Sequence, residues 1–411
     1  MGQSTFPVPS SGSSTSTILP VNASSVILDG SLTSASTYTT TVNGNGGIAY
    51  LTATDNPATI TIGGTAYSVP ANTVVASKAF GASTSVTVTS SNFASTAPTP
   101  WTASTMPVAY WNCTAYGLVG STPTFVAIQG ISGSGAYSTN GSTWTASTLP
   151  GTTVFTSVTY GNGYFVAVGN DTGGTATNAN AYSTNGITWT ASTMPSSKLW
   201  TGVAYGLVGA TPTFVAVQNS GTTAGAYSTN GTSWTASTMP SAFSWRTAVT
   251  YGNGYFVALT YSSVNGAYST NGTTWTASTI PASTWKGATY GNGYYVAVGN
   301  GTTGTYSTNG TTWTTSTMPS SYNWNSVAYG NGYFVAVQSS GNSNGAYSTN
   351  GTTWTLFTTM PSSDAWYSVT YGNGYFVAVQ NSGGTSVGAY YAFPPALPVN
   401  FGIYAGPTTI N

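Results

Sequence analysis

Charged side chains are almost absent from this 411-residue chain. Four basic and four acidic residues make up 2% of it, the formal net charge is zero, and the sequence contains no histidine and no glutamate. A chain without net charge offers no electrostatic attraction to nucleic acid or to an anionic membrane surface, so neither is expected as a partner. Disordered chains are usually poor in aromatic residues, whereas 14% of these residues are aromatic and 40% are hydrophobic. We therefore expect a folded protein with a large core.

The missing residue types also exclude most catalytic and metal sites. Without histidine, neither a Ser-His-Asp triad nor a typical zinc site can be built. Cys113 is the only cysteine, so an intrachain disulfide is excluded and a small buried apolar residue is expected at this position. The sequence therefore predicts a protein that is not an enzyme and that holds no metal and no cofactor.

Long hydrophobic runs are missing as well, so membrane insertion is not expected. The first residues, MGQSTFPVPSSGSSTST, lack the basic and apolar regions of a secretory signal peptide. A location on a virion surface or outside a cell would then be reached by another route, such as release with a virion at lysis.

The chain does contain an internal repeat. One phrase, YGNGYFVAV, recurs intact or altered at intervals of about 40 to 45 residues, which is the period of a four-stranded propeller blade. Within Trp324–Thr358, two Asn-Gly pairs separate strand-like runs, and such a pair between runs is a strong hairpin signal. Each repeat therefore predicts four short antiparallel strands. The seven copies of the phrase begin at Tyr116, Tyr160, Tyr205, Tyr251, Tyr290, Tyr329 and Tyr371.

The two ends of the repeat array complement each other. The last repeat ends at Phe393 without a fourth strand, whereas a fourth-strand segment, WTASTMP, lies at Trp101–Pro107 before the first repeat. A strand from the N-terminal side can complete the last blade and lock the ring. The sequence therefore predicts an all-β fold with a seven-bladed β-propeller that an N-terminal strand closes.

A motif occupies the connection between the third and fourth strands. The segment YSTNGTTW, at Tyr306–Trp313 and Tyr347–Trp354, resembles the Asp-box (BNR) repeat of sialidase-like propellers, and the resemblance covers residues 97–393. This resemblance implies the propeller fold. Asparagine replaces the aspartate of the motif, and an asparagine can still accept local backbone hydrogen bonds. The asparagines are Asn140, Asn185, Asn230, Asn271, Asn309 and Asn350.

Sialidase activity is not expected from this resemblance. Sialidases resemble one another in three arginines that clamp a carboxylate, a Tyr-Glu nucleophile pair and an aspartic acid, but this chain has one arginine, Arg246, and no glutamate. Glycosidase chemistry in general needs two carboxyl groups that flank one bond. The propeller offers only Asp171 and Asp364, which fall on well-separated blades.

Three further segments flank the propeller, which occupies residues 97–393. Residues 1–20 form a Ser/Thr/Pro-rich arm that is expected to be extended. Residues 21–96 contain several strand-like runs and are expected to form a small β-sandwich-like domain for attachment or assembly. Residues 394–411 are too apolar for a solvated linker, so they are expected to dock on the N-terminal domain or on a neighbouring subunit.

Antiparallel geometry sorts the loops of each blade onto two faces. The first-to-second and third-to-fourth turns are mostly uniform, whereas the second-to-third and fourth-to-first loops vary in length and sequence. The variable face also receives the propeller's five charges and one aromatic residue from the start of each first strand. These aromatics either form stacking platforms for sugar rings or fill the spaces between blades. The candidate ligand-binding residues are Trp111, Phe155, Asp171, Lys198, Trp200, Trp245, Arg246, Trp285, Lys286, Tyr322, Trp324, Asp364 and Trp366.

The first functional hypothesis is a non-catalytic virion-surface protein, similar to a phage tail fibre, spike or capsid decoration, that presents the propeller to a host surface or a glycan. Such a protein would contact other subunits through residues 1–96 and 394–411, as a homo-oligomer or in many copies. The alternatives are a bacterial or archaeal surface or filament protein decorated by the propeller, and a soluble lectin.

Overall fold

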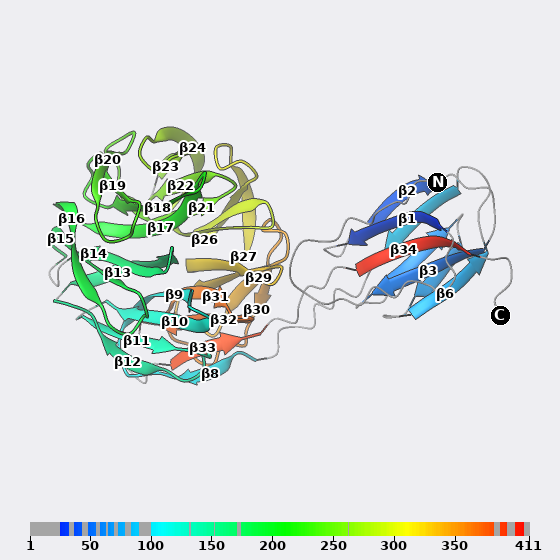
Figure 1. Ribbon diagram of the computed structural model, residues 1–411, viewed down its shortest axis with the longest axis horizontal. Helices are drawn as coiled ribbons and strands as arrows, with labels where there is room; N and C mark the ends of the chain where they lie inside the picture. Colours follow the sequence, from blue (N-terminus) through cyan, green and yellow to red (C-terminus); the bar gives the residue numbers. More distant parts are fainter. Residues whose placement is uncertain are drawn as a thin grey trace. The chain divides into compact units, whose positions relative to one another are not determined.

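The structure, a computed structural model, describes residues 25–89 and 399–406 with gaps between their strands, and residues 100–392 apart from 131–132, 152, 171–173, 262 and 382–386. Every described element is a β-strand, which confirms the all-β class. Contacts divide the chain into two compact units, with Met1–Thr96 and Ala396–Asn411 in unit 1 and Ala97–Pro395 in unit 2 (Figure 1). Among the described residues, no helix is long and apolar enough to cross a membrane.

Unit 1 contains two four-stranded antiparallel sheets. The C-terminal strand lies inside the first sheet, where Ile403 is opposite Leu28 on one side and Leu51 on the other. The sandwich-like packing of the two sheets, and an attachment role for this unit, stay predictions. In sheet order, the first sheet is β1 (Ser25–Leu32), β34 (Val399–Gly406), β3 (Ile48–Thr54) and β6 (Thr73–Lys78), and the second is β2 (Thr37–Val42), β7 (Thr84–Thr89), β4 (Ala58–Ile62) and β5 (Thr65–Val69).

Unit 2 is a β-propeller of six antiparallel sheets. Four sheets each hold four consecutive strands: β9 (Trp111–Val119), β10 (Thr122–Gln129), β11 (Ser134–Ser138) and β12 (Thr145–Thr148); β13 (Val154–Gly161), β14 (Tyr164–Asn170), β15 (Thr177–Ser183) and β16 (Thr190–Lys198); β17 (Trp200–Val208), β18 (Thr211–Gln218), β19 (Ala224–Ser228) and β20 (Thr235–Thr238); β21 (Trp245–Gly252), β22 (Tyr255–Thr260), β23 (Ser263–Ser269) and β24 (Thr276–Ser283).

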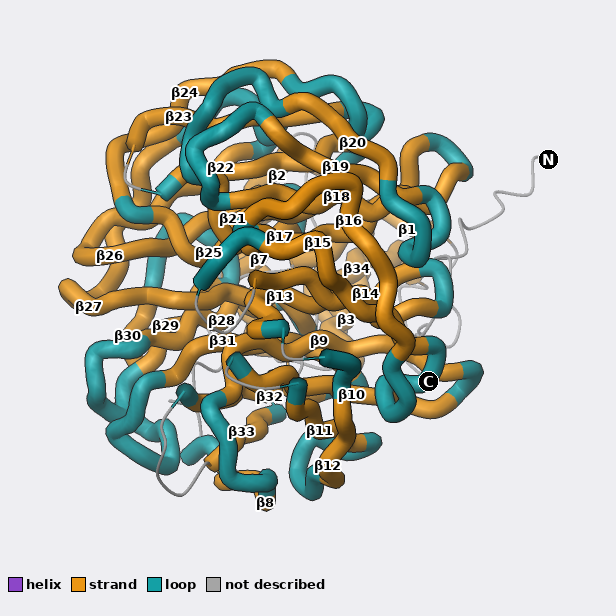
Figure 2. The backbone as a smooth tube through the Cα atoms, turned by 90° about the vertical axis from the view of Figure 1, so that its left-hand side faces the viewer, coloured by secondary structure: helices purple, strands orange, loops and turns teal. Residues whose placement is uncertain are grey.

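The two remaining sheets complete unit 2. One has six strands: β25 (Trp285–Gly291), β26 (Tyr294–Ser307), β27 (Thr314–Gly330), β28 (Tyr333–Gln338), β29 (Gly345–Ser348) and β30 (Thr355–Phe357). The other consists of β31 (Trp366–Gly372), β32 (Tyr375–Gln380), β33 (Val387–Tyr391) and β8 (Thr102–Thr105). Figure 2 shows first strands such as β13, β17 and β31 near the middle of this unit, and fourth strands such as β8, β12 and β24 at its outside.

The prediction of seven blades is wrong as a count of sheets, because two repeats share one sheet. Strand β27 pairs with β26 through its first residues, where Thr314 lies opposite Tyr306. It pairs with β28 through its last residues, where Gly330 lies opposite Tyr333. One unbroken strand therefore serves as the fourth strand of one repeat and the first strand of the next, and six sheets are present where seven blades are predicted.

The ring-closing strand is confirmed. Strand β8 pairs antiparallel with β33, with Ser104 opposite Gly388. Directly before β8, Trp101 is 3% exposed and stacks on Tyr391 and Phe357, at ring-centroid distances of 5.7 and 5.9 Å. Phe357 belongs to β30, so the N-terminal side of unit 2 is packed against its last two sheets.

A second set of contacts runs around the ring from repeat to repeat. In each contact a first-strand glycine lies against the tyrosine ring of the next repeat, and a Cβ atom on Gly372 would stand 2.0 Å from Cγ of Tyr116. Only glycine permits this approach. The pairs are Gly117–Tyr160, Gly161–Tyr205, Gly206–Tyr251, Gly252–Tyr290, Gly291–Tyr329, Gly330–Tyr371 and Gly372–Tyr116, the last of which joins the final repeat to the first.

The third-to-fourth turns share one hydrogen-bond pattern. Asn140 Oδ1 accepts from the backbone N–H groups of Ser142 and Thr143 and from the hydroxyl of Ser138, each at 3.0 Å. The same hydroxyl accepts from the N–H of Gly141 at 2.9 Å. The neutral amide therefore accepts the local hydrogen bonds that are expected of the motif's aspartate. The Asp-box resemblance itself stays a prediction. The pattern recurs at Asn185, Asn230, Asn271, Asn309 and Asn350.

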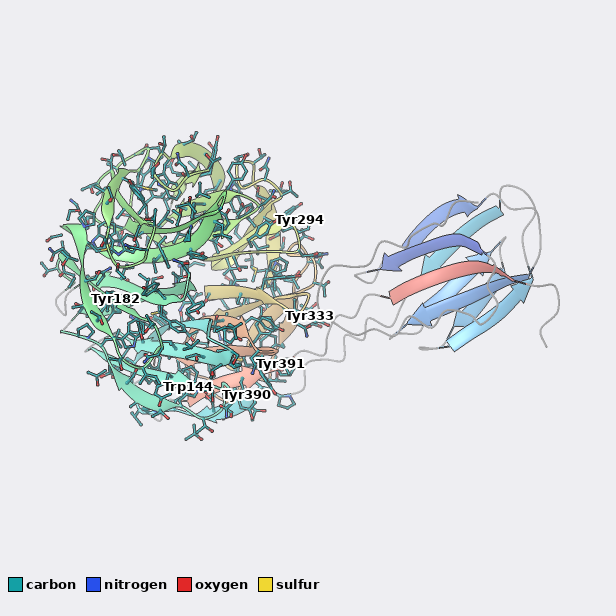
Figure 3. All side chains as sticks on the ribbon, in the orientation of Figure 1. Trp144, Tyr182, Tyr294, Tyr333, Tyr390 and Tyr391 are labelled. Atoms are coloured by element: carbon teal, nitrogen blue, oxygen red, sulfur yellow. The ribbon has the colours of Figure 1, made fainter. Side chains whose placement is uncertain are left out.

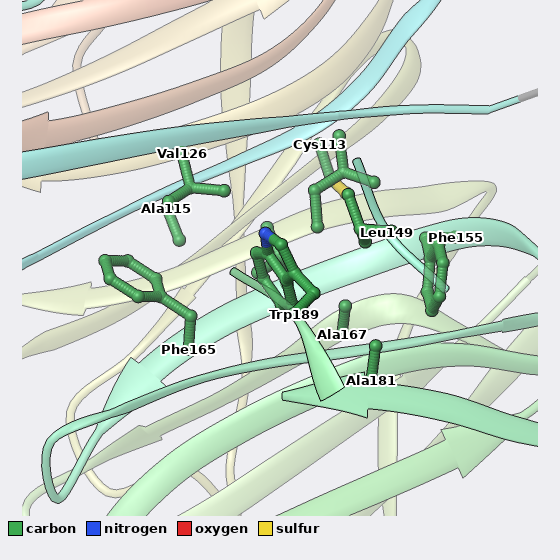
Figure 4. Close-up of a cluster of buried hydrophobic side chains, with 11 residues drawn as sticks. Cys113, Ala115, Val126, Leu149, Phe155, Phe165, Ala167, Ala181 and Trp189 are labelled. Carbon is green, nitrogen blue, oxygen red and sulfur yellow. The ribbon is translucent and has the colours of Figure 1, made fainter. Parts of the chain in front are cut away.

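The core lies between neighbouring sheets. Figure 4 shows a cluster in which Val126 from β10 and Phe165 from β14 are fully buried, with Trp189 of the second repeat beside them. Farther along five of the hairpins, tyrosines of the second and third strands meet edge to face, such as Tyr164 and Tyr182 at 5.9 Å between ring centroids; Tyr182 is labelled in Figure 3. Each sheet is thus covered on both faces by its neighbours.

We predict that Trp101→Ala lowers the free energy of unfolding by about 3–5 kcal/mol, because it removes a large buried ring from the seam that closes the propeller. Thermal and denaturant melting of the full chain measures this loss. The matched control is Thr102→Ala, since Thr102 is the next residue of the same segment and its side chain is exposed. Equal melting temperatures for the two variants would show that the closing strand contributes little.

Candidate functional site

A cavity of about 460 Å³ lies among the first strands of the propeller. Its lining comes from β9, β13, β17, β21, β25, β27 and β31, so every repeat contributes to it. Near the start of these strands the lining side chains are polar, such as Asn112, Ser326 and Lys286, and farther along they are apolar, such as Val327 and Val369. Two asparagines at the ends of second strands, Asn170 and Asn219, add to the polar part.

A β-bulge places one residue from six of the first strands at this cavity. In β25, Trp285 lies opposite Gly299 and Gly287 lies opposite Val298, so Lys286 is an extra residue without a partner in β26. A bulge bends its strand and re-aims the extra side chain, and bulges are common beside functional sites. The residues at this position that line the cavity, here named the bulge ring, are Asn112, Thr156, Thr201, Lys286, Asn325 and Tyr367.

The residue before each bulge is the first-strand aromatic, and all seven of these aromatics are buried. Their exposed fractions are 0–1%, so they have no surface on which a sugar could stack. Trp200, for example, belongs to one cluster with Val166 of the preceding sheet and Phe214 of its own. The platform interpretation is therefore wrong, and the alternative that these rings fill the spaces between blades is confirmed. The seven are Trp111, Phe155, Trp200, Trp245, Trp285, Trp324 and Trp366.

A hydrogen bond fixes each of the buried indoles. The Nε1–H of Trp285 donates to the carbonyl of Pro281, four residues earlier, at 3.1 Å. Equivalent bonds from Trp111, Trp200, Trp245, Trp324 and Trp366 reach carbonyls four residues earlier, at 3.2–3.4 Å. In these six repeats, the segment that leads into the first strand is thereby held against its own tryptophan, which sets where the bulge begins.

Members of the bulge ring bond to the neighbouring repeat in two ways. The hydroxyls of Thr156 and Thr201 donate to the backbone carbonyls of Trp200 and Trp245, both at 2.8 Å. Lys286 instead uses its side chain to reach another side chain, donating from Nζ to Oδ1 of Asn325 at 3.0 Å. The threonine hydroxyls are therefore engaged with backbone, whereas the lysine and asparagine meet each other at the cavity.

Serines deeper in the wall tie the repeats together. The hydroxyl of Ser157 accepts from the backbone N–H of Val203, and that of Ser326 accepts from the N–H of Val369, both at 3.2 Å. The same bond joins the last repeat to the first, from the N–H of Thr114 to Ser368 at 3.2 Å. These bonds make the wall rigid, so the ring above it is held on a fixed frame.

The other predicted site residues do not meet at the cavity. Lys198 ends β16 and Asp364 precedes β31, and neither lines the cavity. Tyr322 accepts a hydrogen bond from Asn344 Nδ2 at 2.7 Å and packs edge to face on Trp324. Asp171 and the side chain of Arg246 lie outside the described residues. Lys286 is thus the one predicted residue that the structure brings to the described lining.

Sequence reasoning missed the rest of the bulge ring, although the repeats contain a signal for it. At the position after the aromatic, the seven repeats carry Asn, Thr, Thr, Arg, Lys, Asn and Tyr in order. The position before it is always Trp or Phe, and the position after it is always small: Cys, Ser, Gly or Thr. A comparison of the repeats with one another would therefore have indicated one variable position between two uniform ones.

Cys113 is the one cysteine in the lining of the cavity. The residue is 7% exposed, and burial raises the pKa of its thiol far above the ordinary value of 9.0. The thiol therefore stays protonated and is a poor nucleophile. Within the described part of the chain, no group of three or more His, Cys, Asp or Glu residues could hold a metal ion.

Comparisons with solved structures identify the fold. A catalytically inactive histidine-to-alanine variant of virginiamycin B lyase from Staphylococcus aureus, with quinupristin, is similar with a TM-score of 0.61 and 13% identity, over 71% of this chain and 99% of that one. A streptogramin B lyase gives 0.60 at 12% identity, over 72% and 99%. YCF48 bound to D1 peptide gives 0.56 at 16% identity, over 72% and 96%. No protein-family model and no curated protein sequence matches the chain.

These comparisons correct two expectations. The sequence predicts a virion-surface or adhesive protein, but the similar structures named above are lyases and YCF48 rather than virion proteins. The sequence also predicts a protein that is not an enzyme, whereas three of the similar structures are enzymes. Neither expectation is kept. At 12–16% identity the likeness shows the β-propeller fold and no particular activity.

We predict that the free energy of unfolding falls as the pH rises past about 9, because the thiol of Cys113 ionises in the unfolded chain before it ionises in the folded one. The stabilisation is fully present below the unfolded pKa and is lost above it, by up to about 1.4 kcal/mol per pH unit. Denaturant melts at a series of pH values measure the slope.

The control for this prediction is Cys113→Ala. In that variant the decline should begin only above about pH 10, where tyrosines with raised pKa values, such as Tyr116 and Tyr371, ionise in the unfolded chain. A variant with the same slope between pH 9 and 10 as the natural chain would contradict the assignment to Cys113.

Proposed function

We propose that the propeller is a binding module that takes a short peptide segment in its central cavity, with the bulge ring as the specificity-determining surface. The observation that carries this proposal is the contrast within the repeats. Structural positions are nearly uniform from one repeat to the next, but the cavity-lining residue after the buried aromatic differs in chemistry around the ring. A symmetric scaffold has no structural need for that difference.

The chemistry of the ring suits a peptide. Asn112 and Asn325 each have a side-chain Nδ2 group that can donate a hydrogen bond to a carbonyl oxygen of a peptide. Tyr367 is 40% exposed, so its ring is accessible as an aromatic anchor, the type of residue that dominates binding energy at interfaces. The cavity volume of about 460 Å³ falls in the range of pockets that hold small ligands.

The comparisons supply one further support and one limit. YCF48, a propeller of similar fold, is described in complex with a D1 peptide, so this architecture is compatible with a peptide ligand. The proposal does not assign the chemistry of the similar lyases to this chain. The inactive lyase variant lacks a histidine, and the present chain contains no histidine at all.

We also infer that the six sheets correspond to seven blades, with the six-stranded sheet counted as two. Two features support this count. The six-stranded sheet contains two first strands, each with a bulge, at Lys286 and Asn325, where each other sheet has one first strand. The glycine–tyrosine contacts that run around the ring number seven, including both Gly291–Tyr329 and Gly330–Tyr371.

The proposal is tested with the full chain and a synthetic library of eight-residue peptides, recovered on immobilised protein and identified by mass spectrometry. Peptides enriched by the natural chain should bind Tyr367→Ala at least about tenfold more weakly, since loss of a hot-spot anchor costs about 2 kcal/mol or more and about 1.4 kcal/mol is tenfold in Kd. Calorimetry on the recovered peptides measures the change in Kd.

The matched control is Asn253→Asp, which alters an exposed turn between β21 and β22, at the opposite end of a first strand from the bulge. Binding should be unchanged there. The proposal fails if no peptide is enriched, or if Asn253→Asp weakens binding while a folded Tyr367→Ala does not.

A further inference from the structure

The bulge ring is divided into two arcs of different character. Lys286, Asn325, Tyr367 and Asn112 come from four successive repeats, on β25, β27, β31 and β9, the last step crossing the ring closure. These side chains carry an ammonium, two amides and a phenol. The other arc holds Thr156 and Thr201, whose hydroxyls donate to backbone carbonyls. Among the described side chains of the bulge ring, one arc is therefore chemically varied and the other carries only threonine hydroxyls.

The chemically varied arc contains the charge of the described lining. Among the described residues that line the cavity, Lys286 is the only one that carries a charge, and none is a carboxylate. Its Nζ donates to Asn325 Oδ1 at 3.0 Å, and this bond fixes the position of the ammonium at the wall. Attraction between opposite charges is stronger in a partly buried site than in bulk water. The cavity thus favours a ligand group of negative charge at this point.

The amide of Asn325, which is bonded to Lys286, narrows the choice of anion. A carboxylate accepts through two oxygens, and an ammonium together with a neighbouring side-chain amide can supply donors to both. At Asn325 the Oδ1 atom accepts from Lys286, so its Nδ2 group is the part of the amide left to donate to a ligand. Asn112 is arranged in the same sense, because its Oδ1 accepts from Nδ2 of Asn381.

We propose that this arc recognises a free carboxylate, and that in a peptide ligand this carboxylate is the C-terminus. Lys286 supplies the charge, Asn325 orients the ammonium and donates its amide, and Tyr367 packs against the last side chain of the peptide. This inference rests on the proposed peptide-binding function, and it specifies which end of the peptide the cavity recognises. The same chemistry could be met by a small free carboxylic acid, which the test includes as a separate arm.

The experiment compares pairs of recovered peptides that differ only at the C-terminus, one with a free carboxylate and one with a carboxamide, on the full chain by calorimetry. A third arm uses benzoate as a small carboxylate. The natural chain should bind the acid at least about tenfold more tightly than the amide, the size expected for one charge-assisted hydrogen bond. The preference should shrink as salt is raised.

Substitutions at the two lysines of the propeller locate the effect. Lys286→Met keeps the length of the side chain and removes the charge, so the acid-over-amide ratio should fall to about one, whereas Lys286→Arg should retain a clear preference for the acid. Lys198→Met is the matched control, because Lys198 does not line the cavity. Thermal melting confirms that each variant is folded before binding is measured.

The outcomes separate the two proposals. Equal binding of acid and amide peptides by the natural chain overturns the carboxylate inference and leaves peptide binding intact. Binding of benzoate but of no peptide, with loss in Lys286→Met, supports the carboxylate site and overturns the peptide. If neither peptides nor benzoate bind, both proposals are wrong. An acid preference that survives in Lys286→Met also overturns the role given to this lysine.

Discussion

In every repeat an aromatic ring at the start of the first strand is buried between neighbouring sheets, and the position of the cavity follows from this contact. Trp200 illustrates it, because the ring packs with Val166 of the sheet before and Phe214 of its own sheet. Its indole N–H is bonded to the carbonyl of Ser196, near the end of the preceding strand β16. Burial of the ring and this hydrogen bond together fix the position and the direction of the start of the strand.

A bulge after this anchor resolves a geometric conflict. In a regular strand, alternate side chains point to opposite faces. The ring of Trp285 must pack sideways between sheets, while Gly287 must leave room for the next repeat, where a Cβ atom would stand 2.8 Å from Cα of Ser326. The extra residue, Lys286, is left out of the ladder and is directed at the cavity. Packing thereby fixes both neighbours of the bulged residue and leaves that residue itself without a structural task in the ladder.

The fold could be predicted from the sequence because its signals are local and repeated. Asn-Gly turns mark the hairpins, and the missing fourth strand of the last repeat indicates the N-terminal strand that closes the ring, which β8 provides. The number of sheets could not be predicted, since the continuity of β27 between Met318 and Trp324 depends on the path of one connection. No turn or breaker signal in the sequence distinguishes this connection clearly from the others.

The candidate site was harder to predict, for a reason that lies in burial. Aromatic residues attract attention as ligand platforms, but whether a ring is exposed depends on which sheet covers it, and in this propeller all seven first-strand rings are covered. The residue after each ring is ordinary by type, and a single repeat gives no reason to select a threonine or an asparagine. The residue faces the cavity because of the bulge, and the bulge is a property of strand register rather than of residue type.

One peptide bond therefore separates the residue that holds each repeat in place from the residue that faces the cavity. Trp324 and Asn325 show the separation most clearly, with the ring fully buried and the amide bonded to Lys286 at the wall of the cavity. Substitution at the first position disturbs packing in two sheets. Substitution at the second changes the cavity and leaves the ladder as it was. A chain with nearly identical repeats can in this way carry a ring of different side chains without loss of the fold, and the differences around that ring define the polar and charged arc from β25 to β9.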